Sequence, residues 1–177
     1  ASCVSMPKTH TRNNPDIPNP KEVKMKKYIN SHLRNAANIA FSNNGLVYFT
    51  ELERGEVIKK MRLNVFSKPE VFMRLPEWIS PLDNTEPQAE GLRVDHEGRL
   101  LIAESGTGKL LRITPDGRKL EVLADSYDGY RFTTVKDLAI GGGDDLFVSS
   151  PFSGTIYRIR PQEGFIGILN DDLVRVE

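Results

Sequence analysis

Residues 37–60 (ANIAFSNNGLVYFTELERGEVIKK), 90–113 (EGLRVDHEGRLLIAESGTGKLLRI) and 136–159 (KDLAIGGGDDLFVSSPFSGTIYRI) align with one another without a gap. A glycine coincides in all three at Gly55, Gly108 and Gly154. Apolar residues coincide at five further positions, which are Ile39/Leu92/Leu138, Phe41/Val94/Ile140, Val47/Leu100/Leu146, Phe49/Ile102/Val148 and Val57/Leu110/Ile156. A repeat of this length is typical of architectures in which each unit buries its apolar face against its neighbours.

Each repeat is predicted to fold as short strands separated by tight turns. In the first repeat the alternating run 39–41 precedes the turn sequence Ser-Asn-Asn-Gly at 42–45, and the β-branched and aromatic run 47–49 precedes a turn at 53–55. A fourth strand is expected after each repeat, at 70–75, 120–123 and 165–169. Four strands in a unit of about 40–50 residues indicate a propeller blade. The sequence therefore predicts an all-β propeller of about three four-stranded antiparallel blades, at 37–76, 90–124 and 136–170.

The first 36 residues have a different character. Residues 1–19 are rich in Pro and Asn and poor in apolar residues, so we expect a disordered tail. Residues 20–36 are predicted to form a short helix or lead-in segment, with Asn19 as its cap and Pro20 in its first turn. The single cysteine, Cys3, excludes an intrachain disulfide. Ala1-Ser2-Cys3 resembles the end of a bacterial lipoprotein signal, so a secreted or lipid-anchored form is the alternative to a free thiol.

The overall charge limits the classes of partner. Among the 177 residues, 24 Lys and Arg side chains balance 24 Asp and Glu side chains. Nucleic-acid binding requires a basic surface, so we expect no nucleic-acid partner. No apolar run approaches the length of a transmembrane segment.

The middle of the chain carries a family resemblance. The runs Gly-Leu-Arg-Val-Asp-His-Glu-Gly-Arg-Leu at 91–100, Thr-Pro-Asp-Gly at 114–117, Val-Leu-Ala-Asp-Ser-Tyr-Asp-Gly-Tyr-Arg-Phe at 122–132, Lys-Asp-Leu at 136–138 and Ser-Pro-Phe-Ser-Gly at 150–154 resemble the senescence marker protein/gluconolactonase family, which includes regucalcin and the sugar lactonases. Strictosidine synthase-like propellers are a weaker second match, through Arg-Phe-Thr at 131–133. The resemblance implies a six-bladed propeller.

The family resemblance also implies a divalent metal ion, commonly calcium, on the axis of the propeller. Its ligands in the family are a Glu that opens the first blade, an Asn before an Asp that opens a middle blade, and an Asp that opens a late blade. These positions correspond to Ala37, to Lys136 with the following Asp137 kept, and to a position beyond Glu177. Alanine cannot bind a metal, and an ammonium group repels one. The resemblance therefore predicts the fold better than the activity, and no metal ligand is assigned.

Propeller geometry predicts where a site would lie. Innermost strands begin, and second strands end, on the same face of the ring. Glu90, Lys136 and Asp137 at the strand starts are the candidate catalytic residues, and Ala37 lies at the equivalent start of the first repeat. Glu51, Glu104 and Ser150 at the strand ends are the candidate substrate-binding residues. In the alternative interpretation each glutamate is a solvated loop residue and Lys136 neutralises a neighbour.

Two functions follow from these features. The first is a gluconolactonase-like hydrolase of a small lactone or ester, in which water is the nucleophile. The second is a non-catalytic propeller segment that binds a ligand or assembles with another chain. Three blades are fewer than the four to eight or so that close a ring. We therefore expect either a piece of a longer propeller or a homodimer that completes the ring.

Overall fold

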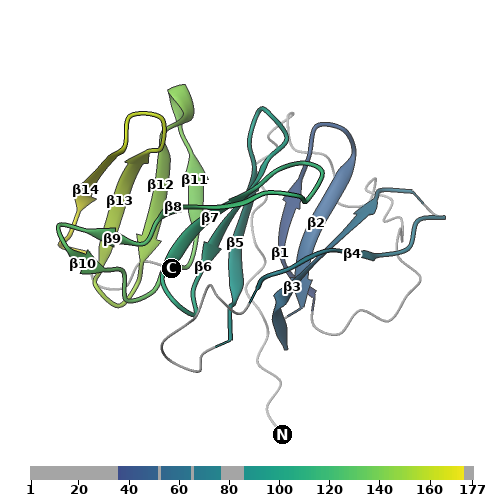
Figure 1. The fold of residues 1–177 in the computed structure, drawn as a ribbon, viewed down its shortest axis with the longest axis horizontal. Coiled ribbons are helices and arrows are strands. Elements are labelled where there is room, and N and C mark those ends of the chain that lie inside the picture. Colours follow the sequence, from purple (N-terminus) through teal and green to yellow (C-terminus); the bar gives the residue numbers. More distant parts are fainter. Residues whose placement is uncertain (1–35, 52, 65, 77–85, 174–177) are drawn as a thin grey trace, which may run out of the picture.

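The computed structural model describes residues 36–51, 53–64, 66–76 and 86–173, and these fold into three four-stranded antiparallel sheets and one two-stranded hairpin (Figure 1). Within each four-stranded sheet the strands follow the order of the chain. The first sheet holds β1 (Ala36–Phe41), β2 (Leu46–Glu51), β3 (Arg54–Arg62) and β4 (Glu70–Arg74). The second holds β5 (Ala89–Val94), β6 (Leu100–Glu104), β7 (Lys109–Ile113) and β8 (Leu120–Ala124). The third holds β11 (Leu138–Ile140), β12 (Leu146–Ser150), β13 (Thr155–Arg160) and β14 (Phe165–Asn170), and the hairpin consists of β9 (Ser126–Tyr127) and β10 (Tyr130–Arg131).

Figure 1 shows the three sheets side by side in chain order, from the blue first sheet to the yellow-green third. This arrangement confirms the prediction of an all-β protein built from four-stranded propeller blades. The predicted tail and helix, with Cys3, lie outside the described residues, apart from Ala36 at the start of β1. Among the described residues, no helix has the length and apolarity needed to cross a membrane.

The second sheet lies at the centre of the packing because both of its faces are buried. All five residues of β6 are buried. Leu100 and Ile102 join the core shared with the first sheet, which includes Tyr48 and Ile58. Leu101 and Ala103 join the core shared with the third sheet. This division follows from the strand itself, because successive side chains of a strand point to opposite faces.

The first sheet departs from the gapless alignment by one residue. Tyr48 pairs with Lys60, whereas the aligned Leu101 and Phe147 pair with Arg112 and Arg158. A register irregularity between β2 and β3 near Glu51 causes the shift. The structural equivalent of Leu110 and Ile156 in the first sheet is therefore Ile58, and the sequence pairing with Val57 was wrong by one position.

The aligned glycines differ for the same reason. Gly108 and Gly154 close four-residue turns with positive φ values of 70° and 63°. A Cβ atom at Gly108 would lie 2.2 Å from the carbonyl oxygen of Phe132, so this turn admits only glycine. Gly55 instead lies within β3 and does not take a positive φ.

Two innermost strands are irregular where they begin. The register of β1 shifts between Ala37 and Ala40, and that of β5 shifts between Ala89 and Gly91. Asn38, inside the first irregularity, takes a positive φ of 52°. β-bulges redirect side chains and are frequent next to functional sites. Both irregularities lie at the end of the sheets where the sequence predicted a site.

Candidate functional site

The candidate site is the end of the three sheets at which β1 and β5 begin and β2, β6 and β12 end; we call it the blade mouth. Asn38 links the first two sheets there, because its Nδ2 donates to the carbonyl oxygen of Ala89 at 3.4 Å. The second and third sheets meet at Gly91, where a Cβ atom would lie 2.9 Å from Cα of Asp137. The structure thus brings the strand starts of all three sheets next to one another. The six candidate residues there are Glu51, Glu90, Glu104, Lys136, Asp137 and Ser150.

Glu104 is turned inward to hold loops. Its side chain is fully buried, and both carboxylate oxygens accept hydrogen bonds. The backbone N–H groups of Gln88 and Gly106 donate to Oε1, each at 2.8 Å, and that of Thr107 donates to Oε2 at 3.1 Å. The Thr107 hydroxyl also bonds to Oε2. A carboxylate bonded in this way braces the 105–108 turn against the segment that enters β5 and has little capacity left to bind substrate.

The carboxylate of Glu90 has a different environment from that of Glu104, although Glu90 lies only two residues after Gln88, which donates to Glu104. It is half-buried inside the β5 bulge, and its Oε1 accepts a hydrogen bond from the Ser105 hydroxyl at 3.0 Å. The carbonyl oxygen of Ser105 accepts in turn from the Thr134 hydroxyl at 2.9 Å. Ser105 therefore connects Glu90 to the 105–108 turn that Glu104 holds. One hydroxyl contact leaves lone pairs of the Glu90 carboxylate available to water or substrate.

Asp137 is held by an arginine from the neighbouring sheet. Nη2 of Arg93 lies 3.2 Å from Oδ1 of Asp137, and the backbone N–H of Leu138 donates to Oδ1 at 2.8 Å. Arg93 also donates from Nη1 to the carbonyl oxygen of Leu92 at 2.7 Å. Lys136 is exposed, and its backbone N–H donates to the carbonyl oxygen of Ser149 at 3.0 Å. The mouth between the second and third sheets therefore carries two cationic side chains and two carboxylates.

The two remaining candidates are engaged or buried. Glu51 forms an ion pair with Lys59, with Nζ 2.8 Å from Oε1. Ser150 is buried, and its hydroxyl oxygen has no hydrogen-bond partner among the described residues. It occupies the position that Glu104 holds in the second sheet, at the end of the second strand.

Two residues of the mouth escaped the sequence interpretation. Arg93 aligns with Ala40 and Ala139, so a charged residue among alanines was the signal that marks it. Asn38 aligns with Gly91 and Asp137, a position that is polar in two of the three repeats. Both residues lie between the shared apolar positions, and only the apolar positions were used to predict the fold.

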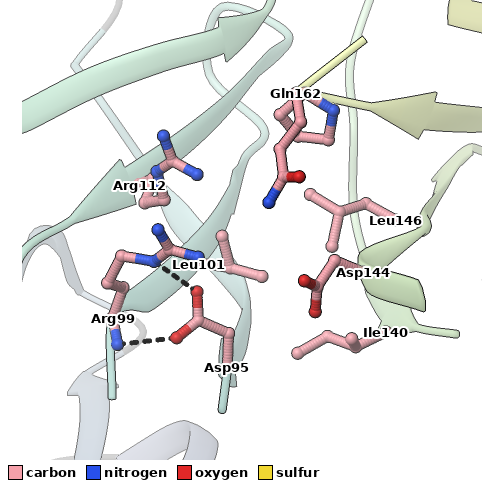
Figure 2. A pocket seen from close by; sticks show the side chains of 9 residues that line it. Asp95, Arg99, Leu101, Arg112, Ile140, Asp144, Leu146 and Gln162 are labelled. Carbon is pink, nitrogen blue, oxygen red and sulfur yellow. Dashed lines mark hydrogen bonds and ion pairs between the residues drawn. The ribbon is translucent and has the colours of Figure 1, made fainter. Parts of the chain in front are cut away.

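A cavity lies at the opposite end of the sheets, between the second and third blades (Figure 2). Its volume is about 20 Å³, which is too small for a sugar-sized ligand. Asp95 anchors one side, since its Oδ1 accepts from the backbone N–H of Arg99 at 2.9 Å and its Oδ2 accepts from Nε of Arg99 at 2.6 Å. The lining residues are Asp95, Arg99, Leu101, Arg112, Ile140, Asp144, Leu146, Pro161 and Gln162.

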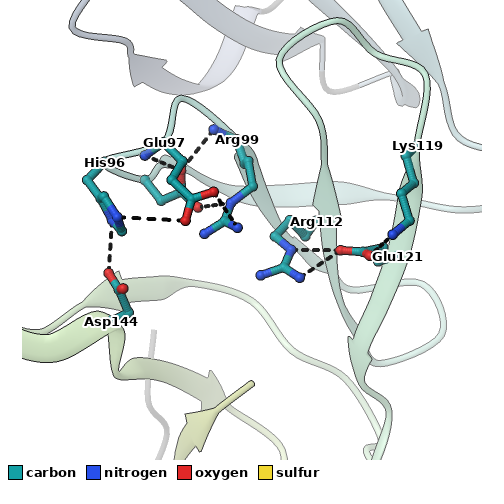
Figure 3. A network of polar contacts seen from close by, with 8 residues as sticks. His96, Glu97, Arg99, Arg112, Lys119, Glu121 and Asp144 are labelled. Carbon is teal, nitrogen blue, oxygen red and sulfur yellow. Dashed lines mark hydrogen bonds and ion pairs between the residues drawn. The ribbon is translucent and has the colours of Figure 1, made fainter. Parts of the chain in front are cut away.

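An ion-pair network surrounds this cavity (Figure 3). His96 bridges the two sheets, with Nδ1 3.0 Å from Oδ1 of Asp144. Hydrogen bonds from Lys119 and then from Arg112 lower the pKa of Glu121. The contact of His96 with Asp144 fastens the turns of the two blades together, whereas the contacts of Glu121 lie within the second sheet.

A related clamp lies within the third sheet. Asp145 accepts from Nε of Arg158 at 2.8 Å and from Nε of Arg160 at 2.9 Å. The hydrogen bond from Arg158, with a further one from Arg160, lowers the pKa of the Asp145 carboxyl against the opposing effect of burial.

The residues of the mouth do not fit the calcium ion that the family resemblance implies. Arg93 occupies the carboxylate of Asp137, and backbone N–H groups occupy that of Glu104. Ala37 and Lys136 stand at two of the family's ligand positions. Nowhere in the described part of the chain do three His, Cys, Asp or Glu side chains gather to hold a metal. Hard divalent cations need several oxygen ligands, so no reaction step is assigned to a metal here.

The chain is similar in sequence to the gluconolactonase of Zymomonas mobilis, with 31% identity over 88 residues. This match covers 50% of the chain and 22% of that protein, so it reaches only about a fifth of the relative's length. No protein-family model matches the chain.

Solved structures resemble the chain in fold. The gluconolactonase of Xanthomonas campestris superposes with a TM-score of 0.62 at 17% identity, over 78% of this chain and 48% of that one. The virginiamycin B lyase of Staphylococcus aureus superposes with a TM-score of 0.57 at 17% identity, over 78% of this chain and 42% of that one. These similarities show the propeller fold, and the chain spans less than half of each of these two proteins.

Proposed function

We propose that this chain, a partial and divergent relative of gluconolactonases, belongs to a hydrolase that opens a small lactone or ester. The observation that carries the proposal is the 31% identity to a gluconolactonase over half of the chain. The polar residues at the blade mouth support it, because Glu90 accepts a hydroxyl hydrogen bond there and Arg93 pairs with Asp137 at the same end of the sheets.

In this proposal Glu90 is the general base. Its carboxylate takes a proton from water, and the water oxygen forms a bond to the carbonyl carbon of the lactone. The ammonium group of Lys136 stabilises the negative charge that develops on the carbonyl oxygen. The ring C–O bond then breaks, and the proton held by Glu90 passes to the departing alkoxide. The products are a carboxylic acid and an alcohol on one open chain, and the acid releases its proton to solvent as it ionises to the carboxylate.

Asp137 and Arg93 form the supporting part of this proposed site. Their ion pair joins the second and third sheets beside Gly91, and it fixes the segment that carries Lys136. Glu104 is not included among the proposed substrate-binding residues, because its carboxylate is bonded to three backbone N–H groups. Glu51 remains a proposed substrate contact at the edge of the mouth, whereas Ser150 is not included because its hydroxyl is buried.

The test uses glucono-δ-lactone as the probe, with proton release followed by a pH indicator. We expect Glu90→Gln to lower kcat by about 10²–10⁴-fold, the usual contribution of a positioned general base. Lys136→Met is expected to lower kcat with a smaller change in KM. Glu163→Gln, a matched change at an exposed residue of the far end, should leave the rate unchanged. Absence of hydrolysis by the wild type, or full activity in Glu90→Gln, would exclude this assignment.

The same assay tests whether hydrolysis requires a metal ion. Because the residues present do not fit a calcium site, we expect a chelator and added calcium to leave the rate unchanged. Loss of activity on chelation, restored by calcium, would instead support the metal that the family resemblance implies.

The second candidate function is a propeller segment that works through assembly. One observation favours it: the outer face of the third sheet holds an open, largely apolar depression of about 160 Å³.

A further inference from the structure

We propose that Asn38 determines specificity for hydroxylated lactones, because its side-chain carbonyl accepts a hydrogen bond from a hydroxyl group of the substrate at the blade mouth. The inference rests on the lactone ligand of the proposed function and adds the residue that selects among lactones. The feature that carries it is an oriented, solvent-accessible amide that contacts the residue directly before Glu90.

The backbone of Asn38 takes an unusual conformation. Three described residues other than glycine have a positive φ, and two of them, Asp128 and Asp144, lie outside the strands. Asn38 is the one that lies within a strand, at the irregular start of β1. Asparagine tolerates this region better than most residues, but the conformation still has a cost. Backbone outliers of this kind cluster at catalytic and ligand-binding sites.

Hydrogen bonds fix the orientation of the Asn38 amide. Its Nδ2 donates to Oγ1 of Thr50 at 3.1 Å and to the carbonyl oxygen of Ala89 at 3.4 Å. The hydroxyl of Thr50, which is buried, donates its own hydrogen to the carbonyl oxygen of Ala37 at 3.4 Å. Oγ1 of Thr50 therefore accepts from Asn38, and the amide nitrogen faces Thr50 and Ala89. The amide oxygen, Oδ1, faces away from both.

This amide oxygen is available to a ligand. Oδ1 of Asn38 has no hydrogen-bond partner among the described residues. Among the described residues that are not exposed, Ser150 alone has a side-chain oxygen or nitrogen that is both buried and without a partner. Because Asn38 is half-buried, its Oδ1 must reach solvent. A carbonyl oxygen accepts hydrogen bonds and cannot donate them, so its partner is a donor such as a hydroxyl group.

The position of Asn38 indicates which donor it meets. The amide contacts Ala89, and both Asn38 and Glu90 lie within the irregular starts of their strands. The aligned position is Gly91 in the second repeat and Asp137 in the third, and the carboxylate of Asp137 already forms an ion pair. Asn38 thus supplies the unpaired acceptor at this position. A lactone bound with its carbonyl group at Glu90 offers a ring hydroxyl to this acceptor only if it is hydroxylated, as sugar-derived lactones are.

The first experiment compares hydrolysis of glucono-δ-lactone, which has ring hydroxyl groups, with that of δ-valerolactone, which has none. The measured quantity is the ratio of the two kcat/KM values. Asn38→Gly removes the amide and suits the positive φ, so we expect this ratio to fall about 3–10-fold, the contribution of one neutral hydrogen bond. Thr50→Val removes the hydroxyl that orients the amide, so the ratio should fall here too.

Asn44→Gly is the matched control, because it makes the same change in the turn at the other end of β1. It should leave the ratio as in the wild type. General loosening of the mouth lowers both kcat/KM values together and also leaves their ratio unchanged. An unchanged ratio in Asn38→Gly or in Thr50→Val would therefore overturn the inference.

The second experiment measures binding without hydrolysis. Glucono-δ-lactam and δ-valerolactam, in which a ring N–H replaces the ring oxygen, are compared by ligand-observed NMR. We expect the hydroxylated lactam to bind more tightly, and Asn38→Gly to remove this preference. If the wild type hydrolyses neither lactone, the hydrolase proposal fails and the lactams decide the role of Asn38. A preference that Asn38→Gly removes then supports that role, whereas equal or absent binding of the two lactams overturns it.

Discussion

Replacing Glu104 by glutamine tests the bonding at the centre of the blade mouth. In the wild type Oε1 accepts from Gln88 and Gly106, and Oε2 accepts from the N–H and hydroxyl of Thr107. Glutamine keeps one oxygen for the first pair, but its NH2 group then faces the N–H of Thr107. A buried donor left without an acceptor costs about 1–3 kcal/mol, and the hydrogen bonds that remain lose their charge assistance.

One effect acts in the opposite direction. The neutral amide avoids the desolvation penalty of a buried carboxylate, and this offsets part of the loss in stability. We therefore expect Glu104→Gln to lower the free energy of unfolding by about 2 kcal/mol. The assay is urea unfolding followed by circular dichroism, with comparison of midpoints at equal slope.

Glu90→Gln is the matched control for this measurement. Glu90 accepts one hydroxyl hydrogen bond, which an amide oxygen can also accept, so we expect a change below about 0.5 kcal/mol. If Glu104→Gln is as stable as the wild type to within that margin, the carboxylate does not brace the turn and the reasoning fails.

Three further predictions concern stability. Gly91→Ala introduces a Cβ atom 2.9 Å from Cα of Asp137, so we expect a loss of about 1–3 kcal/mol in thermal unfolding; Gly142→Ala, with nothing within 4 Å, should lose far less. Because its arginine partners hold the pKa of Asp145 below the usual value, its stabilising contribution is present above about pH 4 and is lost as the pH falls through the folded-state pKa. Asp145→Asn should reduce this loss of stability at acidic pH, and an unchanged pH dependence of stability would contradict the assignment. Burial raises the pKa of Tyr48, so the tyrosine ionises more readily in the unfolded chain and Tm should fall above about pH 10. The Tm of Tyr48→Phe should fall less over the same pH range.

The repeats made the sheets predictable because the same positions bury apolar residues in each blade. Leu100 and Ile102 on one face and Leu101 on the other follow directly from strand alternation. The register of the first sheet could not be predicted, because the coincidence of Gly55 with Gly108 and Gly154 hides a turn of different length.

The blade mouth was predictable in place but not in chemistry. Strand ends fix which residues reach the mouth, and the structure places Glu90 on β5 and Asp137 just before β11, next to Gly91. The inward turn of Glu104 depends on the backbone N–H of Gln88, which lies outside the aligned repeat. The partner of Asp137, Arg93, comes from another blade across 44 positions of sequence. Neither contact could be inferred from the repeat pattern of the sequence.

The burial of both faces of the second sheet sets the order in which the fold loosens. The first and third sheets each share one core with the second sheet, so either can separate while the other shared core stays intact. The second sheet cannot open without exposing both, and β6 is buried along its whole length. Stability in stacked repeats is a sum over neighbouring contacts, so the amides of Leu100–Glu104 should exchange with solvent most slowly. Fluctuations then begin in the outer sheets, and the middle one is the last to melt.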